Sequence, residues 1–142
     1  MIYSSSQIKV RYAETDKMNV VYHSNYLVWF DIARTQMLEE IGLPYRDLEA
    51  DGYFIPVLTA NLEYLRSARF DDILDVQLRV MEKPRVRMRF EYEIKRANEL
   101  IAIGATTHGF IDIRGNARRP PKNFLQKINE IWPPKQSTTK PA

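Results

Sequence analysis

Residues 24–41 read SNYLVWFDIARTQMLEEI, and this stretch decides how the rest of the chain can fold. Its apolar residues recur at helical spacing, with Tyr26 and Phe30 on one face. Ser24 is a suitable N-cap and Gly42 a suitable residue just past the C-terminus. Because the middle of the stretch is apolar nearly all round, we expect a helix that is buried on several sides.

Outside this helix, much of the chain alternates apolar and polar residues. Residues 85–97, RVRMRFEYEIKRA, are the clearest case and predict an antiparallel strand with one buried face. Connections as short as EKP and ANE allow hairpins but no parallel crossovers, and Asn98 suits a left-handed turn. The predicted strands are residues 7–13, 56–66, 73–82, 85–97 and 100–114, and the other predicted helices are residues 44–51 and 122–131.

One mostly apolar helix and a single antiparallel sheet make an α+β protein, and a five-stranded sheet wrapped around the long helix fits the order of elements. The 142 residues are enough for one domain with its own core. We therefore predict a single domain over residues 1–132. Residues 133–142, PPKQSTTKPA, are predicted to form a disordered tail.

The composition excludes several kinds of chemistry. There is no cysteine, which removes disulfides, thiolate zinc sites and a cysteine nucleophile, and which fits a reducing cytosol. The two histidines, His23 and His108, have no carboxylates at metal-ligand spacing, so no metal site is expected. G-x-S-x-G, P-loop and G-x-G-x-x-G motifs are missing. No segment has the length of a signal peptide or a membrane span, and we expect a cytoplasmic protein.

Asp16 is the carboxylate that merits attention, because it precedes the long helix within ETDKMNVVYHSNY, residues 14–26. The first amides of a helix are unpaired and carry about half a positive charge, so they can stabilise an oxyanion that forms near Asp16. The ordinary interpretation is a turn aspartate, since Asp favours turns for its own reasons. The residues alone leave both interpretations open.

This segment resembles the active-site segment of hotdog-fold acyl-CoA thioesterases of the 4-hydroxybenzoyl-CoA type, including those associated with Tol–Pal gene clusters. The matching positions are Asp16, residues 20–23 (VVYH), residues 25–26 (NY) and residues 33–35 (ART), and the resemblance covers about residues 7–125. It implies a hotdog fold whose sheets pair edge to edge, with active sites at the subunit interface. The homo-oligomer would be a dimer or a homotetramer made of two dimers.

By this resemblance, Asp16 is the catalytic carboxylate, acting as nucleophile or as general base. The backbone N–H of His23 is the donor that polarises the thioester carbonyl. Tyr22, Asn25 and Tyr26 belong to the same motif and are candidate substrate-binding residues, although Tyr26 also fits the core or an interface.

Asn19 departs from the family pattern, which has a glycine four residues before the His23 position. Glycine permits a positive φ, and asparagine is the residue next most able to adopt one, so we expect the turn to persist.

Arginines are candidate ligands for the phosphates of coenzyme A. Arg85 and Arg119, near strand ends, are the candidates, whereas Arg87 and Arg89 equally fit a solvated outer face of the sheet. The net charge of +3 suits an anionic ligand.

Three functions are weighed. The first is an acyl-CoA thioesterase with no metal or redox cofactor, coenzyme A being part of the substrate. The second is hydrolysis of acyl groups from acyl carrier protein, which would also favour a basic surface. The third is a non-catalytic basic protein that binds RNA or DNA; against it, the arginines alternate with Glu91 and Glu93, so we expect no nucleic-acid partner.

Overall fold

The long helix forms the centre of the protein. The computed structural model describes residues 1–133, and in it α1 spans Asn25–Glu40. Gly42 has a φ of +83° and ends the helix in the way that its position predicts. The prediction for Ser24 is wrong in one respect, because its side chain makes no capping hydrogen bond.

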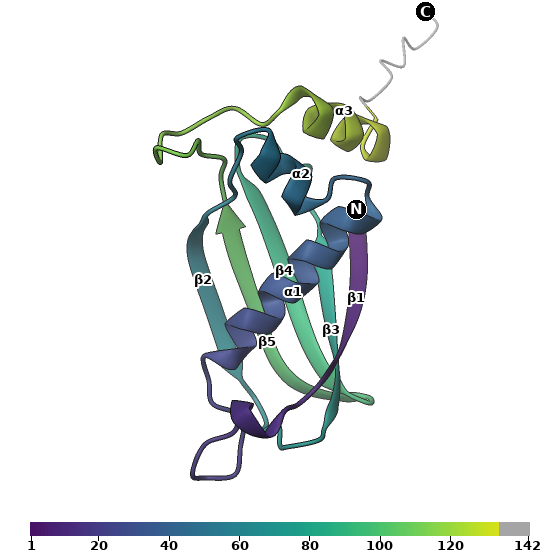
Figure 1. The fold of residues 1–142 in the computed structure, drawn as a ribbon. Helices are drawn as coiled ribbons and strands as arrows, with labels where there is room; N and C mark the ends of the chain where they lie inside the picture. Colours follow the sequence, from purple (N-terminus) through teal and green to yellow (C-terminus); the bar gives the residue numbers. More distant parts are fainter. Residues whose placement is uncertain (134–142) are drawn as a thin grey trace, which may run out of the picture.

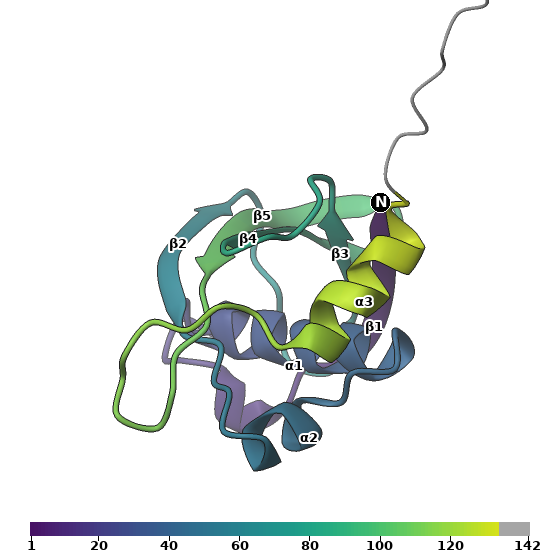
Figure 2. The ribbon, with the colours of Figure 1, turned by 90° about the horizontal axis from the view of Figure 1, so that it is seen from above.

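Five antiparallel strands wrap around α1 in the order β1-β3-β4-β5-β2 (Figure 1). Seen from above, the sheet curves over the helix, and α3 lies across one end of the fold (Figure 2). The predicted architecture is therefore confirmed. The elements are β1 (Ile2–Lys9), η1 (Tyr12–Glu14), α1, α2 (Tyr45–Ala50), β2 (Val57–Tyr64), β3 (Ile73–Val80), β4 (Met88–Arg96), β5 (Glu99–His108) and α3 (Lys122–Ile131).

The first strand lies earlier in the chain than the predicted residues 7–13. Its inward face carries two buried serines, Ser4 and Ser6, beside Ile2. The Ser6 hydroxyl donates to the side-chain carbonyl of Gln36 on α1 at 3.0 Å, which compensates for burying a polar group. A strand whose buried face is partly serine does not show apolar alternation, and the sequence pattern therefore misplaced it.

The other four strands are all shorter than predicted, and the last two most clearly, because alternation in the sequence continues beyond the sheet. Residues 85–87 precede β4, and Val86 is 58% exposed. The chain leaves β5 after His108, six residues before the predicted end. In the hairpin between β4 and β5 the positive φ belongs to Ala97, at +53°, and not to Asn98 as expected.

The core lies between α1 and the sheet. Phe30 of α1 stacks on Tyr92 of β4 with ring centroids 3.9 Å apart. Gly104 of β5 allows this approach, because a Cβ there would lie 2.7 Å from both a Phe30 ring carbon and the Asn61 carbonyl oxygen. The buried apolar residues form one core, against which Trp132 still packs.

One face of α1 and the β2 edge of the sheet are uncovered. Leu27, Val28 and Ile32 are 42%, 50% and 43% exposed, so the expectation that the middle of the helix is buried on several sides is wrong for the single chain. Strand β2 is at the edge and is exposed along nearly its whole length. None of the helices within residues 1–133 combines the length and apolarity of a membrane span. Residues 134–142 of the predicted tail lie outside the described residues.

Candidate active site

Asp16 lies in a tight turn between η1 and α1. Its N–H donates to the Val20 carbonyl, and the Asn19 N–H donates to the Asp16 carbonyl, both at 2.9 Å. Asn19 has a φ of +62°, so the expected left-handed conformation is confirmed. The Asp16 oxygen Oδ1 accepts the Met18 N–H at 2.8 Å. Asp16 therefore does stabilise its own turn, while its Oδ2 has no hydrogen-bond partner within residues 1–133.

Helix α1 begins beside this turn, at Asn25. The Tyr22 N–H donates to the Glu14 carbonyl at 2.8 Å, and the Asn25 N–H donates to the Tyr22 carbonyl at 3.0 Å. The His23 N–H, which lies between these two, has no acceptor in the part of the chain that the structure describes. A helix N-terminus with an unpaired amide can donate to an oxyanion.

Glu14 ties the Asp16 turn to the helix, and the sequence analysis did not single it out. It is 4% exposed; its Oε1 accepts the Arg11 N–H at 2.7 Å and its Oε2 accepts the Trp29 indole N–H at 2.9 Å. Its backbone carbonyl also accepts the Asn25 side-chain amide at 2.9 Å. Burial raises the pKa of Glu14, but the hydrogen bonds from Arg11 and Trp29 and the charge of Arg11 outweigh it and hold the pKa below its usual value.

A cavity of about 270 Å³ opens beside Asp16. The Tyr64 hydroxyl donates to the His23 carbonyl at 3.0 Å, and the Tyr64 ring meets Tyr26 edge-on at 5.1 Å. Tyr64 thereby holds the backbone next to the unpaired amide. The residues that line the cavity are Asp16, Met18, Val20, Val21, His23, Tyr26, Tyr64, Leu65, Arg66 and Ser67.

Tyr64 and Arg66 line this cavity and were missed by the sequence analysis. Tyr64 is the last residue of β2, and Arg66 comes two residues later. Both lie more than forty positions after Asp16, so no local spacing in the sequence links them to it. A backbone hydrogen bond between the two loop segments holds them together: the Val21 N–H donates to the Ala68 carbonyl at 2.8 Å. Only the fold could reveal them.

The predicted residues fall into two groups. Asp16, His23 and Tyr26 line the cavity, Asn25 contacts Glu14, and the exposed Tyr22 ring lies 4.3 Å from the His23 ring. All five belong to the turn before α1 or to the first residues of α1.

Arg85 and Arg119 are not brought to Asp16 within one chain. Strand β3 pairs Ile73 with Lys9 near the Asp16 turn, and Val80 with Ile2 at the other end of the sheet. Arg85 follows that far end, in the connection to β4. Arg119 follows Arg118, whose guanidinium lies 3.8 Å from the Tyr53 ring beside α2, also at the far end.

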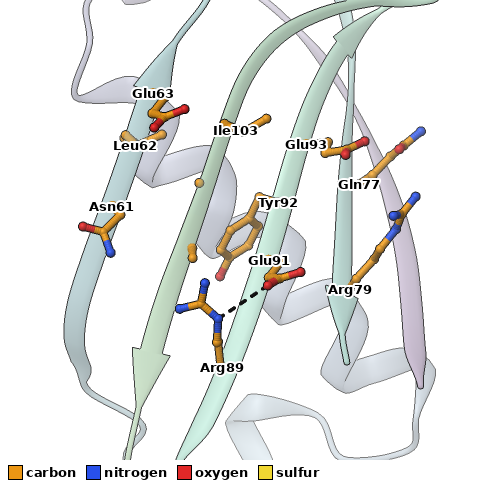
Figure 3. Close-up of a pocket in the computed structure, with 12 residues that line it drawn as sticks. Asn61, Leu62, Glu63, Gln77, Arg79, Arg89, Glu91, Tyr92, Glu93 and Ile103 are labelled. Atoms are coloured by element: carbon orange, nitrogen blue, oxygen red, sulfur yellow. Dashed lines mark ion pairs between the residues drawn. The ribbon is translucent and has the colours of Figure 1, made fainter. Parts of the chain in front are cut away.

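A larger cavity, of about 360 Å³, lies on the outer face of the sheet, away from Asp16 (Figure 3). Its rim is charged with both signs: Arg89 pairs with Glu91 at 3.5 Å, and Glu93, Glu63 and Arg79 surround them. Glutamates that alternate with arginines do not build the continuous positive stripe of a nucleic-acid surface. Within residues 1–133 there is also no group of three or more side chains that could hold a metal ion.

The fold defines a hotdog protein, and its candidate site places Asp16 and His23 around one cavity beside the start of the central helix. Residues 10–128 match the model of the thioesterase-like superfamily, and the chain belongs to this family. The resemblance and the fold predicted from the sequence are both confirmed.

Relatives agree with this assignment. The chain is 34% identical over 110 residues to a putative acyl-CoA thioesterase, YneP, of Bacillus subtilis, covering 77% of this chain and 80% of that protein. The structure of a DHNA-CoA thioesterase from Staphylococcus aureus superposes with a TM-score of 0.87 at 33% identity, covering 93% of this chain and 92% of that one. A 4-hydroxybenzoyl CoA thioesterase shares the fold, with a TM-score of 0.81 at 18% identity, over 90% of this chain and 99% of that one.

Proposed function

We propose that this protein is a cytoplasmic acyl-CoA thioesterase, which hydrolyses an acyl-CoA to the free acid and coenzyme A. One observation carries the proposal: Asp16 and the unpaired backbone amide of His23 flank the same cavity at the start of α1. Relatives that are named acyl-CoA thioesterases support the substrate class.

In the proposed mechanism, the thioester oxygen accepts the His23 N–H at the positive end of α1. Negative charge grows on this oxygen as the carbonyl carbon is attacked, and one such donor is commonly worth roughly 10²–10³ in rate. Asp16 acts in one of two ways. It takes a proton from an attacking water, or its carboxylate attacks directly and forms a mixed anhydride that water then hydrolyses. In both routes the C–S bond breaks, and the departing coenzyme A thiolate takes up a proton.

The aromatic residues around the cavity have separate parts in this proposal. Tyr64 holds the His23 carbonyl, which fixes the direction of the adjacent amides. Tyr26 packs against Tyr64 and forms the inner wall, while the exposed Tyr22 stands at the mouth beside His23. Asn25 acts through its hydrogen bond to Glu14. Its contact with substrate is then indirect.

Arg66 is the proposed ligand for the phosphates of coenzyme A. It lines the cavity, its side chain is 63% exposed, and its ion pair with Glu99 is long, at 3.9 Å. An exposed pair of this kind contributes little, so the guanidinium can turn toward a phosphate, which it binds in a bidentate manner. The proposal involves no metal and no redox cofactor.

We further propose that two copies pair along β2, with a dimer or a dimer of dimers as the working state. An unpaired strand edge carries free N–H and C=O groups and invites pairing with another strand. The exposed Leu27, Val28 and Ile32 on α1 add an apolar face that a second subunit would cover. Arg85 and Arg119 would reach a substrate only across such an interface.

The test is release of free thiol from a panel of short, long and aromatic acyl-CoAs. The proposal expects turnover of at least one class, and the preferred class defines the acyl group. If no member of the panel is hydrolysed, the acyl-CoA proposal is wrong, and binding of RNA and DNA at low salt becomes the next measurement.

A carrier-protein thioester is the second candidate substrate. Lys17 and Arg69 are exposed beside the Asp16 turn, in addition to Arg66, and a cationic rim suits an acidic carrier. Turnover of the same acyl group should be compared on coenzyme A and on acyl carrier protein. A higher kcat/KM on the protein would favour this second candidate.

A further inference from the structure

The chain between β5 and α3 forms a rigid turn, residues 111–117, which we call the tip loop. Ile111 and Ala117 bridge its base. The Asp112 oxygen Oδ1 accepts the N–H groups of Arg114 and Asn116, at 2.9 and 3.0 Å, and Gly115 supplies the φ of +85° that the turn requires. The loop is therefore preorganised.

At the end of this rigid loop stand an isoleucine and an arginine. Ile113 is 84% exposed, more than any other large apolar side chain within residues 1–133, and Arg114 beside it is exposed as well. No hydrogen bond or ion pair of the Arg114 side chain is found within the same residues. The loop thus holds an apolar and a cationic group in fixed positions away from its own chain.

The tip loop projects past the β2 edge of the sheet. In Figure 1 it lies beyond the upper end of β2, and in Figure 2 it extends past β2 on the side of the sheet that carries α1. Its base is attached to the chain just before β2, because Ile111 also bridges Phe54. A subunit that pairs with β2 would therefore meet this loop.

If the proposed β2 pair has its two-fold axis at the middle of the strand, the position of that meeting follows. Antiparallel pairing then sets Val57 of one subunit opposite the partner's Tyr64. Phe54, three residues before Val57, falls opposite the partner's Ser67. Ser67 lines the cavity beside Asp16, so the base of the tip loop lands next to the cavity of the other subunit.

We propose that the tip loop of each subunit closes the active-site cavity of the other. Ile113 packs on the exposed apolar rim formed by Tyr64 and Leu65, which are 48% and 50% exposed in the single chain. Arg114 supplies a cation for the phosphates of coenzyme A, opposite Arg66. This inference rests on the proposed substrate and on pairing along β2.

The first test is a cross-link that needs no activity. The chain has no cysteine, so Ile113→Cys combined with Ser67→Cys introduces the only thiols. Within one chain these positions are separated by the length of β2, roughly 25 Å, which no disulfide can bridge. Mild oxidation, or a short bismaleimide, should give a covalent dimer from the double variant. Each single variant serves as the control and should remain uncross-linked.

Light scattering on the same sample measures whether the protein is a dimer before cross-linking. With that information each outcome of the cross-linking either supports or overturns the proposal. A dimer that gives a covalent product supports the proposal. A dimer that gives none with either reagent overturns it, and so does a monomer.

The second test uses mixed dimers. Arg114→Ala should raise the KM for acyl-CoA about 10-fold, because a charge-assisted contact is lost, and leave the KM for the matching acyl-pantetheine unchanged. Arg79→Ala, on the outer face of β3, is the matched arginine control. A mixed dimer combines one Asp16→Asn chain with one Arg114→Ala chain. Its only intact Asp16 is on the Arg114→Ala chain, and the proposal places the intact Arg114 of the other chain at that site.

This mixed dimer should show the wild-type KM and about half the wild-type kcat. A raised KM would mean that Arg114 acts within its own chain, and an unchanged KM in the Arg114→Ala homodimer would mean that it does not bind substrate; either result overturns the proposal. If the wild type hydrolyses no acyl-CoA, the proposed function has failed, while the cross-link still decides where the loop lies.

Discussion

Glu14 and His108 are both buried ionisable side chains, and they lie at opposite ends of the sheet. Both oxygens of the Glu14 carboxylate accept hydrogen bonds, and its pKa lies below the usual value, so it stays charged. His108 shares a hydrogen bond with Thr106 at 2.8 Å, but its Nδ1 has no partner within residues 1–133. Burial, with the positive charge of Arg34, lowers the pKa of His108 to about 4, so it stays neutral.

The difference shows how the two ends are organised. Around Glu14, hydrogen bonds to one buried charge fix the turn that carries Asp16 and the start of α1. Around His108, the packing is largely apolar and aromatic, with the Phe90 ring edge-on at 5.0 Å. A rigid polar framework is therefore found at the end where a reacting carbonyl would need fixed donors.

Among changes that compare the two ends of the sheet, the largest effect is expected from Glu14→Gln, which places an amide NH₂ against either the Arg11 or the Trp29 N–H. One buried donor is then unpaired, which costs about 1–3 kcal/mol of stability. If this framework also holds Asp16 opposite the His23 amide, kcat falls by about 10- to 100-fold with little change in KM. Thiol-release kinetics and urea unfolding measure both. Glu49→Gln, on the exposed side of α2, is the control, and an unchanged kcat would contradict the framework role.

The next largest effect is expected in the pH dependence of the free energy of unfolding, and His108 causes it. Since the folded protein binds this proton more weakly than the unfolded chain, the unfolded state is protonated first as the pH falls. Stability should therefore decrease below about pH 6.5 and down to about pH 4, by up to about 1.4 kcal/mol per pH unit. Glu14 acts in the same direction, but only below its ordinary pKa of 4.5.

Urea unfolding at several pH values checks this slope. His108→Gln should remove it, whereas the exposed His23→Gln should keep it. A wild-type curve that is flat between pH 6.5 and pH 5 would contradict the neutral, buried state of His108.

Removing an arginine at either end of the sheet should have a smaller effect, on the KM for acyl-CoA. Arg66→Ala should raise the KM for acyl-CoA about 10-fold, because Arg66 lines the cavity beside Asp16. Arg85→Ala should raise it by a smaller factor, since Arg85 lies at the far end of its own chain. Steady-state kinetics on the same acyl-CoA compare the two. The reverse order would show that Arg85 contributes more to binding of the coenzyme than Arg66 does.

The smallest expected effect is a change in stability from relieving backbone strain at Ala97, in the hairpin near the Asp16 end of the sheet. Ala97 has a φ of +53°, a conformation that costs an alanine about 1 kcal/mol and a glycine almost nothing. Ala97→Gly should therefore raise the free energy of unfolding by up to about 1 kcal/mol without changing kcat. Denaturant unfolding measures this. A loss of stability would mean that the hairpin needs the alanine side chain.

The sequence predicted the parts of the molecule that local patterns encode. Helical periodicity placed α1, and alternation placed β4 to within a few residues, because each signal is carried by neighbouring positions. β1 was misplaced because its buried face includes two serines, Ser4 and Ser6, of which Ser6 bonds to the helix.

The candidate site could be predicted in part for the same reason. Asp16 and His23 are close in sequence, and the structure places both in the lining of one cavity. Glu14 was not predicted, because its burial depends on an indole fifteen residues away. Arg66 was not predicted, because only the folded chain brings the segment after β2 to the cavity. Arg85 and Arg119 were chosen for being near strand ends, and the sequence does not reveal at which end of the sheet they lie.

The central claim is that Asp16 does chemistry and does not merely form its turn. The most direct measurement is kcat at saturating acyl-CoA for the wild type, Asp16→Asn and Asp75→Asn. Asparagine keeps the oxygen that accepts the Met18 N–H, so the turn should persist, and Asp75, on the outer face of β3, controls for the loss of one negative charge. We predict that kcat falls at least about 100-fold in Asp16→Asn alone, with unfolding unchanged. Wild-type turnover by a folded Asp16→Asn would contradict the account and leave Asp16 as a turn residue only.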